Sequence, residues 1–227
     1  VSFVQFGLVV VLVLSLPLWK KTDRAAVEEP GAKRGNGSVW KLPGIGANLA
    51  AFFAYCALEL TAGLWFASYL VGVRGVKAET ATAWAASYYF GIMLGRMVNG
   101  FLTMKFSSKT LIRAGQALIL LGIVMLFLPG NAFSLVGLVL VGMGCAPIFP
   151  SMLHETPRRF GEENSSRLMG IQMAAAYVGL TVAPPLVGVI AGRLSLGVFP
   201  YALLVLLALM VLGSERVNKI TAHHYEL

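Results

Sequence analysis

The chain has 227 residues, of which 57% are hydrophobic and only 12% are charged. A single soluble domain of this size cannot bury so many apolar side chains, so the composition excludes an ordinary soluble protein and indicates a multi-pass membrane protein. The net charge of +8 does not indicate nucleic-acid binding, because the basic side chains gather in alternate connections between apolar runs.

Apolar runs between clusters of Pro, Gly and charged residues are the predicted elements. A helix needs about 20 apolar residues to cross the hydrocarbon core of a bilayer, and the runs lack the short alternating segments of an outer-membrane barrel. The predicted fold class is therefore all-α, a polytopic membrane protein with seven transmembrane helices, at approximately residues 2–19, 47–72, 80–104, 110–129, 132–152, 167–191 and 195–213.

The first of these runs stands apart from the other six. The chain begins with Val1, and neither a charged segment nor a small-residue cleavage site accompanies the run, so we expect residues 1–19 to be a lone transmembrane helix that ends a preceding half, not a signal peptide. Residues 20–46 hold six basic and three acidic side chains among prolines and glycines and are predicted to form a cytoplasmic linker. A six-helix bundle at 47–214 and a cytoplasmic tail at 215–227 complete the predicted organisation.

Basic residues also predict the orientation in the membrane. Fifteen of the 18 Lys and Arg residues lie on connections that share one side, and the positive-inside rule makes that side cytoplasmic. The N-terminus of the chain is then outside and its C-terminus inside, and we expect the protein in a bacterial cytoplasmic (inner) membrane.

The second run carries an acidic residue, Glu59, near its midpoint, and no other charge occurs between residues 47 and 72. A charged side chain at this depth costs roughly 3 kcal/mol or more, so ionisable residues there usually have a function. At helical spacing Tyr55 lies one turn from Glu59 on the same face, within hydrogen-bonding reach, and Phe52 and Phe66 share that face. The alternative is a neutral Glu59 that donates a hydrogen bond to a neighbouring helix.

Polar and amphipathic residues within other runs are further candidates for contact with a substrate. Tyr88 lies in the third run, and Gln172 and Tyr177 lie in the sixth. Gln172 has two interpretations, a hydrogen bond to a neighbouring helix or a contact with a substrate. Cys56 and Cys145 are sufficiently explained as small hydrophobic residues, so we expect neither a disulfide nor a metal site.

Glycines and prolines predict where helices approach closely and where one is interrupted. Gly91 and Gly95 in the third run have the spacing that allows close helix packing. Pro147 and Pro150 in the fifth run each remove a backbone donor, and we expect them to interrupt its helix near the cytoplasmic side.

The order of a basic linker followed by six runs, together with two local motifs, resembles the C-terminal half of a major facilitator superfamily transporter. The third run ends in Gly-Arg-x-x-x-Gly-Phe-Leu, and the fifth ends in Pro-Ile-Phe-Pro followed by Thr-Pro-Arg-Arg-Phe-Gly. The chain is similar to the branch that includes fucose permease-like sugar transporters. The resemblance implies that the first run is the family's sixth helix, that the others are its seventh to twelfth, and that a missing N-terminal half of the same transporter is the partner.

The resemblance also implies where a substrate binds. The first helix of each three-helix repeat lines the family's central cavity, and here these are the second and fifth runs, so Glu59 lies at mid-depth on a cavity-lining helix. The candidate substrate-binding residues are Glu59, Tyr55, Tyr88, Gln172 and Tyr177. The candidate gating residues are Arg96, Asn99, Pro147 and Pro150.

One motif departs from the family pattern. Met104 stands where the family has an acidic residue in the loop after the third run, and Ser107 stands where it has a glycine. A charge latch at the cytoplasmic gate is therefore not expected in this half, and Lys105 is interpreted as an anchor on the cytoplasmic side.

The predicted function is secondary active transport of a small polar solute, such as a sugar, by alternating access and driven by a proton gradient. The bilayer and the solute are the expected partners, and no cofactor is expected, since no Gly-rich loop ending in Lys-Ser/Thr is present. One alternative is efflux of hydrophobic compounds, since aromatic residues including Trp65 flank Glu59, and another is a receptor or scaffold that transports nothing. An enzyme is not predicted, because His154 beside Glu155 at a helix end and a lone acid at depth make no catalytic pair.

Overall fold

The computed structural model describes residues 10, 13, 15 and 38–222 of the chain. The chain divides into two units, Val1–Asn36 and Gly37–Leu227. In the first unit the described residues, at positions 10, 13 and 15, are helical. The predicted lone helix at 1–19, most of the predicted linker at 20–46 and the end of the tail at 223–227 lie outside the described residues.

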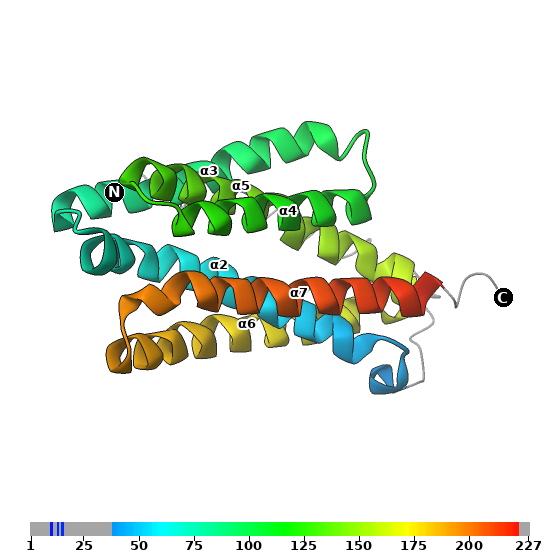
Figure 1. The fold of residues 1–227 in the computed structure, drawn as a ribbon. Coiled ribbons are helices and arrows are strands. Elements are labelled where there is room, and N and C mark those ends of the chain that lie inside the picture. Colours follow the sequence, from blue (N-terminus) through cyan, green and yellow to red (C-terminus); the bar gives the residue numbers. More distant parts are fainter. Residues whose placement is uncertain (1–9, 11–12, 14, 16–37, 223–227) are drawn as a thin grey trace. The chain divides into compact units, whose positions relative to one another are not determined.

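Helices account for the second unit, and no strand occurs within residues 38–222 (Figure 1), which confirms the all-α prediction for this part of the chain. Two short 3-10 turns, η1 (Val39–Lys41) and η2 (Leu196–Val198), precede the first and the last α-helix. The six α-helices of residues 38–222 are α2 (Ile45–Arg74), α3 (Ala78–Leu102), α4 (Ser108–Phe127), α5 (Asn131–Phe160), α6 (Glu162–Arg193) and α7 (Phe199–Ala222).

Five of the helices in the described part of the chain are long and apolar enough to cross a membrane, namely α2, α4, α5, α6 and the segment that contains α7. The helix α3 has 25 residues, which is sufficient length. No 18-residue stretch of α3 is as apolar as the most apolar stretch of each of the other five helices. The predicted span at 80–104 is confirmed as a helix.

The helix α5 differs from its prediction. We expected Pro147 and Pro150 to interrupt it, but both lie inside one continuous α-helix. Each proline removes only its own N–H donor, and its ring needs space beside the preceding turn. Pro147 lies where α5 packs against α4, since a Cβ on Gly115 of α4 would lie 3.1 Å from the proline ring.

Two helix ends differ from their predictions. The loop expected at residues 156–164, between the fifth and sixth runs, is shorter than predicted, because α5 continues to Phe160 and α6 begins at Glu162. The turn between them is Gly161, whose φ of 85° is a conformation that favours glycine. The helix α7 continues to Ala222, past residue 214, where the sequence predicts the end of the bundle.

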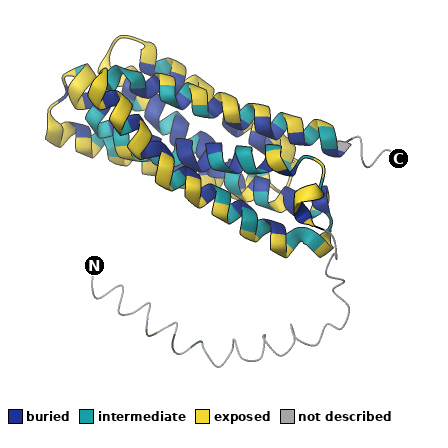
Figure 2. Ribbon diagram, turned by 90° about the horizontal axis from the view of Figure 1, so that it is seen from below, coloured by how far each residue is buried: buried dark blue, intermediate teal, exposed yellow. Residues whose placement is uncertain are grey.

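The helices of the second unit pack in two groups of three (Figure 1). In one group α5 packs against α3 and α4, and in the other α2 packs against α6 and α7. The groups meet mainly where α2 contacts α3 and α5, where α4 contacts α7 and where α5 contacts α6. The first helix of each three-helix repeat therefore packs mainly against the second and third helices of the other repeat. Buried residues line the inward faces of the helices, and exposed ones lie outside (Figure 2).

Glycines allow the closest of these helix contacts. A Cβ on Gly95 of α3 would lie 2.6 Å from the Cβ of Ala146 in α5, which confirms the close approach predicted for this glycine. A Cβ on Gly144 of α5 would likewise lie 2.6 Å from the backbone oxygen of Gly115 in α4. No side chain fits at either position, so α5 lies nearly backbone to backbone with both neighbours.

A polar cluster joins α4, α5 and α7 at the end of the bundle where α4 begins. Arg113 of α4 donates two hydrogen bonds of 2.7 Å to the carboxylate of Glu215 in α7. Arg159 of α5 donates a 2.7 Å hydrogen bond to Asn218 of α7. The buried carboxylate of Glu155 lies 3.6 Å from the Arg159 guanidinium. These contacts connect the two groups of helices.

Candidate functional site

The candidate site is built on α2, whose charged residues are Glu59 and the terminal Arg74. Most of the central turns of α2 are buried against other helices, including Leu58 and Thr61 on either side of Glu59. Glu59 itself is only half-buried. Its side chain therefore lies on a part of the helix surface that is open to a cavity.

The cavity has a volume of about 490 Å³ and lies among α2, α3, α5 and α6. This volume is within the range of small-molecule sites, roughly 300–1,000 Å³. Its lining residues are Tyr55, Cys56 and Glu59 from α2, Arg96 and Asn99 from α3, Ala146, Phe149 and Pro150 from α5, and Met173, Ala176, Tyr177 and Leu180 from α6.

Most of the predicted site residues meet at this cavity. Of the predicted substrate-binding residues, Glu59, Tyr55 and Tyr177 line it. Of the predicted gating residues, Arg96, Asn99 and Pro150 line it. Tyr88, Gln172 and Pro147 do not, and each of these three is buried in the helix packing.

The polar groups of the cavity carry opposite charges. The carboxyl group of Glu59 lies close enough to the Tyr55 hydroxyl and to the Arg96 guanidinium to interact with both. Arg96 is exposed, and within the described residues it forms no direct ion pair with Glu59. One turn along α3, the buried side-chain oxygen of Asn99 has no hydrogen-bond partner among the described residues. The cavity therefore offers an acid, a guanidinium and an amide to one bound molecule.

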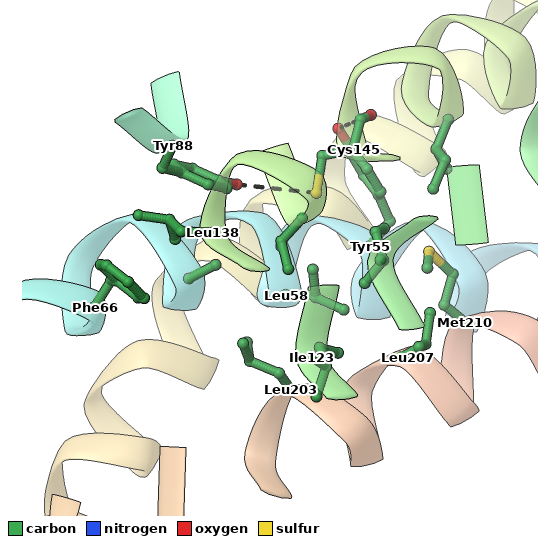
Figure 3. Close-up of a cluster of buried hydrophobic side chains, with 14 of the residues drawn as sticks. Tyr55, Leu58, Phe66, Tyr88, Ile123, Leu138, Cys145, Leu203, Leu207 and Met210 are labelled. Carbon is green, nitrogen blue, oxygen red and sulfur yellow. Dashed lines mark hydrogen bonds between the residues drawn. The ribbon is translucent and has the colours of Figure 1, made fainter. Parts of the chain in front are cut away.

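Tyr55 has a different hydrogen-bond acceptor from the one the sequence suggests. Its hydroxyl donates to the backbone oxygen of Cys145 in α5, at 3.0 Å, and the side chain is 2% exposed (Figure 3). The Tyr55 ring also lies 5.9 Å from the ring of Phe149, between their centroids. Tyr55 thus joins α2 to α5 while its hydroxyl remains beside Glu59.

Tyr88 lies behind the cavity wall. Its hydroxyl donates to the backbone oxygen of Glu59 at 2.9 Å. The same hydroxyl points toward the Cys145 sulfur (Figure 3), at 3.9 Å. Because the side chain is 1% exposed, this position supports a role in holding the Glu59 turn of α2 against α3 rather than direct contact with a solute.

Gln172 also has its polar atoms engaged within the protein. Its amide nitrogen lies 3.0 Å from the Thr156 hydroxyl, and its amide oxygen lies 3.1 Å from the same hydroxyl. The side chain has no exposed surface. Of the two interpretations of Gln172, the structure favours the hydrogen bond to a neighbouring helix.

Sequence reasoning missed the apolar half of the cavity. Phe149 follows Pro147 in a segment that we expected to be irregular, so its direction was not predictable. Met173, Ala176 and Leu180, by contrast, are spaced at three and four residues along α6, as is typical of one helix face. This spacing could have identified them, together with Tyr177, as one wall.

The chain is similar to known proteins in sequence and in fold. Residues 47–214 match the sequence pattern of the Major Facilitator Superfamily. The chain belongs to that superfamily. This membership, with the apolar helices α2 and α4–α7, identifies a multi-pass membrane protein. Major facilitator proteins of known structure are transporters rather than enzymes, which agrees with the class that the sequence predicts.

A curated relative of this major facilitator chain is Bypass of stop codon protein 6 from Saccharomyces cerevisiae. The two are 26% identical over 219 residues, an alignment that covers 90% of this chain and 43% of the yeast protein. The chain thus spans less than half of the length of this relative. The relative is from a yeast, so it gives no support to the predicted bacterial inner membrane.

Solved structures of transporters share the fold. A variant of the E. coli fucose:proton symporter is similar with a TM-score of 0.65 and 14% identity, covering 78% of this chain and 44% of the symporter. A variant of the peptide transporter POT in complex with alafosfalin gives a TM-score of 0.67 and 17% identity, covering 84% and 42%. At these identities the similarity establishes the fold, and it is consistent with the predicted resemblance to fucose permease-like proteins.

Proposed function

We propose that the chain is the C-terminal half of a secondary transporter that carries a small polar solute, such as a sugar. Transport takes place by alternating access and is driven by a proton gradient. One observation supports the proposal most directly. Acidic, basic, hydroxyl and amide groups from α2 and α3 converge on a cavity of about 490 Å³ inside a bundle of apolar helices. Such a cavity can replace the hydration shell of a polar solute at membrane depth.

Roles for the cavity residues follow from their positions. Glu59 and Arg96 bind the polar groups of the solute, and the amide of Asn99, which also lines the cavity, is a further polar contact. Tyr177, which is 65% exposed, contacts the solute from α6. Pro150 and Arg96 belong to the part of the wall that changes when the cavity opens to the other side. In this proposal the C-terminal end of α7 is cytoplasmic, in accordance with the basic residues of the connections.

Transport by the full-length protein in proteoliposomes tests this function. Labelled monosaccharides, L-fucose among them, are offered with and without an imposed pH gradient. We expect gradient-driven uptake of at least one sugar, and Glu59→Gln should lower uptake at least tenfold. The matched control is Glu79→Gln, because Glu79 is an exposed acid in the first turn of α3, away from the cavity. Equal uptake by Glu59→Gln and the parent protein would show that the site assignment is wrong.

Efflux of a lipophilic cation is the second candidate, and the composition of the wall favours it. Phe149, Met173 and Leu180 place apolar surface beside Glu59. The sequence suggested Phe52 and Phe66 for this wall, but both have no exposed surface and lie in the core. Counterflow of labelled tetraphenylphosphonium in the same vesicles distinguishes this candidate from sugar transport. Absence of flux for both solute classes would leave the receptor or scaffold interpretation.

A further inference from the structure

A second cavity continues the first one along the contact between α2 and α6. Its volume is about 480 Å³. Leu180 lines both cavities, so they adjoin at this side chain. The lining residues are Leu64, Trp65 and Ser68 from α2, and Leu180, Thr181, Pro184 and Pro185 from α6.

The two helices run in the same direction through both cavities. The backbone of Phe53 lies beside Gly179, and the ring of Trp65 lies beside Gly188. Residue numbers therefore rise together, and the second cavity lies nearer the ends at Arg74 and Arg193 than the first. At a rise of about 1.5 Å per residue, Ser68 is roughly 14 Å along the α2 axis from Glu59. A molecule that occupies both cavities must be elongated.

The chemistry of the second cavity differs from that of the first. No charged residue is among those that line it. The Thr181 hydroxyl donates to the Tyr177 backbone oxygen at 2.8 Å, and the Trp65 indole nitrogen donates to the Pro184 backbone oxygen at 2.9 Å. With these donors engaged in the protein, the second cavity presents mainly the indole ring, leucines and proline rings.

We infer that the solute is an amphiphile, whose polar or charged end binds between Glu59 and Arg96 and whose apolar portion lies in the second cavity. A glycoside with an apolar aglycone occupies both cavities, whereas a free monosaccharide occupies only the first and binds more weakly. The inference rests on the proposed function, because it assigns the second cavity to the same transported molecule. Its physical basis is the adjacency of a polar and an apolar cavity, since each buried methylene favours binding about fourfold.

Thiol labelling in membrane vesicles tests the position of the two ends. The full-length transporter carries either Met173→Cys, which reports on the first cavity, or Ser68→Cys, which reports on the second. Labelling by N-ethylmaleimide is quantified by peptide mass spectrometry, and Cys145, which has no exposed surface, is the internal control for intact folding. The probes are two pairs with matched polar ends, methyl and hexyl β-D-glucoside, and tetraethylammonium and hexyltriethylammonium, below their critical micelle concentrations.

For one of the two pairs, we expect the short member to slow labelling of Met173→Cys alone and the hexyl member to slow labelling of both cysteines at least tenfold. The inference is overturned if the hexyl member protects only Met173→Cys. It is also overturned if Ser68→Cys is unreactive without any probe, since the missing half would then fill the second cavity. Protection of Ser68→Cys by hexanol to the same extent as by the hexyl probe would overturn it too, since a lipid-like chain would then be the occupant. If no probe protects Met173→Cys and none shows counterflow, the proposed function fails together with the inference.

A second variant distinguishes a loss of binding of the solute's apolar portion from a loss of folding of the site. Ser68→Phe fills the second cavity and leaves every residue of the first unchanged. It should abolish the advantage of the hexyl over the short probe in competition assays while the short probe is still transported. An undiminished advantage of the hexyl probe in a variant that is folded would contradict the assignment of the second cavity.

Discussion

At the scale of single residues, two tyrosines of the bundle make the same kind of hydrogen bond and differ in their access to the cavity. Tyr55 and Tyr88 each donate a hydroxyl hydrogen bond to a backbone oxygen, and each is nearly fully buried. Only Tyr55 lines the cavity. Replacing each tyrosine by phenylalanine should therefore have equal effects on stability and unequal effects on transport.

We expect Tyr55→Phe and Tyr88→Phe each to lower the free energy of unfolding by about 1 kcal/mol, the usual loss for one buried hydrogen bond. Tyr55→Phe should also raise the KM for the solute more than Tyr88→Phe does, because only Tyr55 lines the cavity. Thermal unfolding of the purified transporter and initial uptake rates measure the two effects. A raised KM for Tyr88→Phe with an unchanged KM for Tyr55→Phe would reverse the roles given to these residues.

At the scale of helices, the packing of α5 depends on positions where a side chain does not fit. Gly144 lies against the Gly115 backbone, whereas a methyl group on Gly100 of α3 would have no neighbouring atom within 4 Å. Glycine-to-alanine changes at the two sites provide a matched pair, since both residues are helical. In each, the higher helix propensity of alanine stabilises the helix by the same free energy, about 1 kcal/mol.

Gly144→Ala should destabilise the transporter, because the added methyl group forces α4 away from α5, with a cost of about 1–3 kcal/mol that is typical of overpacking. Gly100→Ala should be neutral or stabilising. The fraction of monodisperse protein that survives a heating series measures the difference. Equal survival of the two variants would show that α4 and α5 are not held at backbone contact.

The helices also show how far the sequence could predict the structure. The third run was predicted at 80–104 and the helix spans Ala78–Leu102, because charged and polar residues mark its ends. The end of α5 was missed, because local rules treat a proline as an interruption, whereas α5, packed against α3 and α4, stays helical through Pro147, Pro150 and Pro157. The cavity position of Glu59 was predictable from its cost in an apolar helix, but the contact of Tyr55 with Cys145, which lies 90 residues away in the chain, was not.

At the scale of the whole bundle, the polar cluster formed by α4, α5 and α7 contains ion pairs of two kinds. Arg113 and Glu215 are partly exposed, with side-chain exposures of 61% and 32%. Glu155 and Arg159 are each 4% exposed. Water screens the first pair and not the second.

Glu155→Gln should therefore destabilise the bundle much more than Glu215→Gln. The first change leaves the buried Arg159 guanidinium without its carboxylate, at a cost of about 3 kcal/mol or more, whereas the second removes a pair that is solvated in the folded protein. Chemical denaturation in detergent micelles, with the double variant as the test of additivity, measures both. A larger loss for Glu215→Gln would contradict this ranking.

The exchange of partners between the two three-helix repeats has a consequence for biosynthesis. The helix α2 is complete at Arg74, but its main partners α6 and α7 begin only at Glu162 and Phe199. At a synthesis rate of about 5–20 residues per second, α2 waits on the order of ten seconds for its first main partner. During this interval the Glu59 face must be shielded by the insertion machinery or by α3. We therefore expect variants that slow the emergence of α6 to lower the amount of folded protein in the membrane.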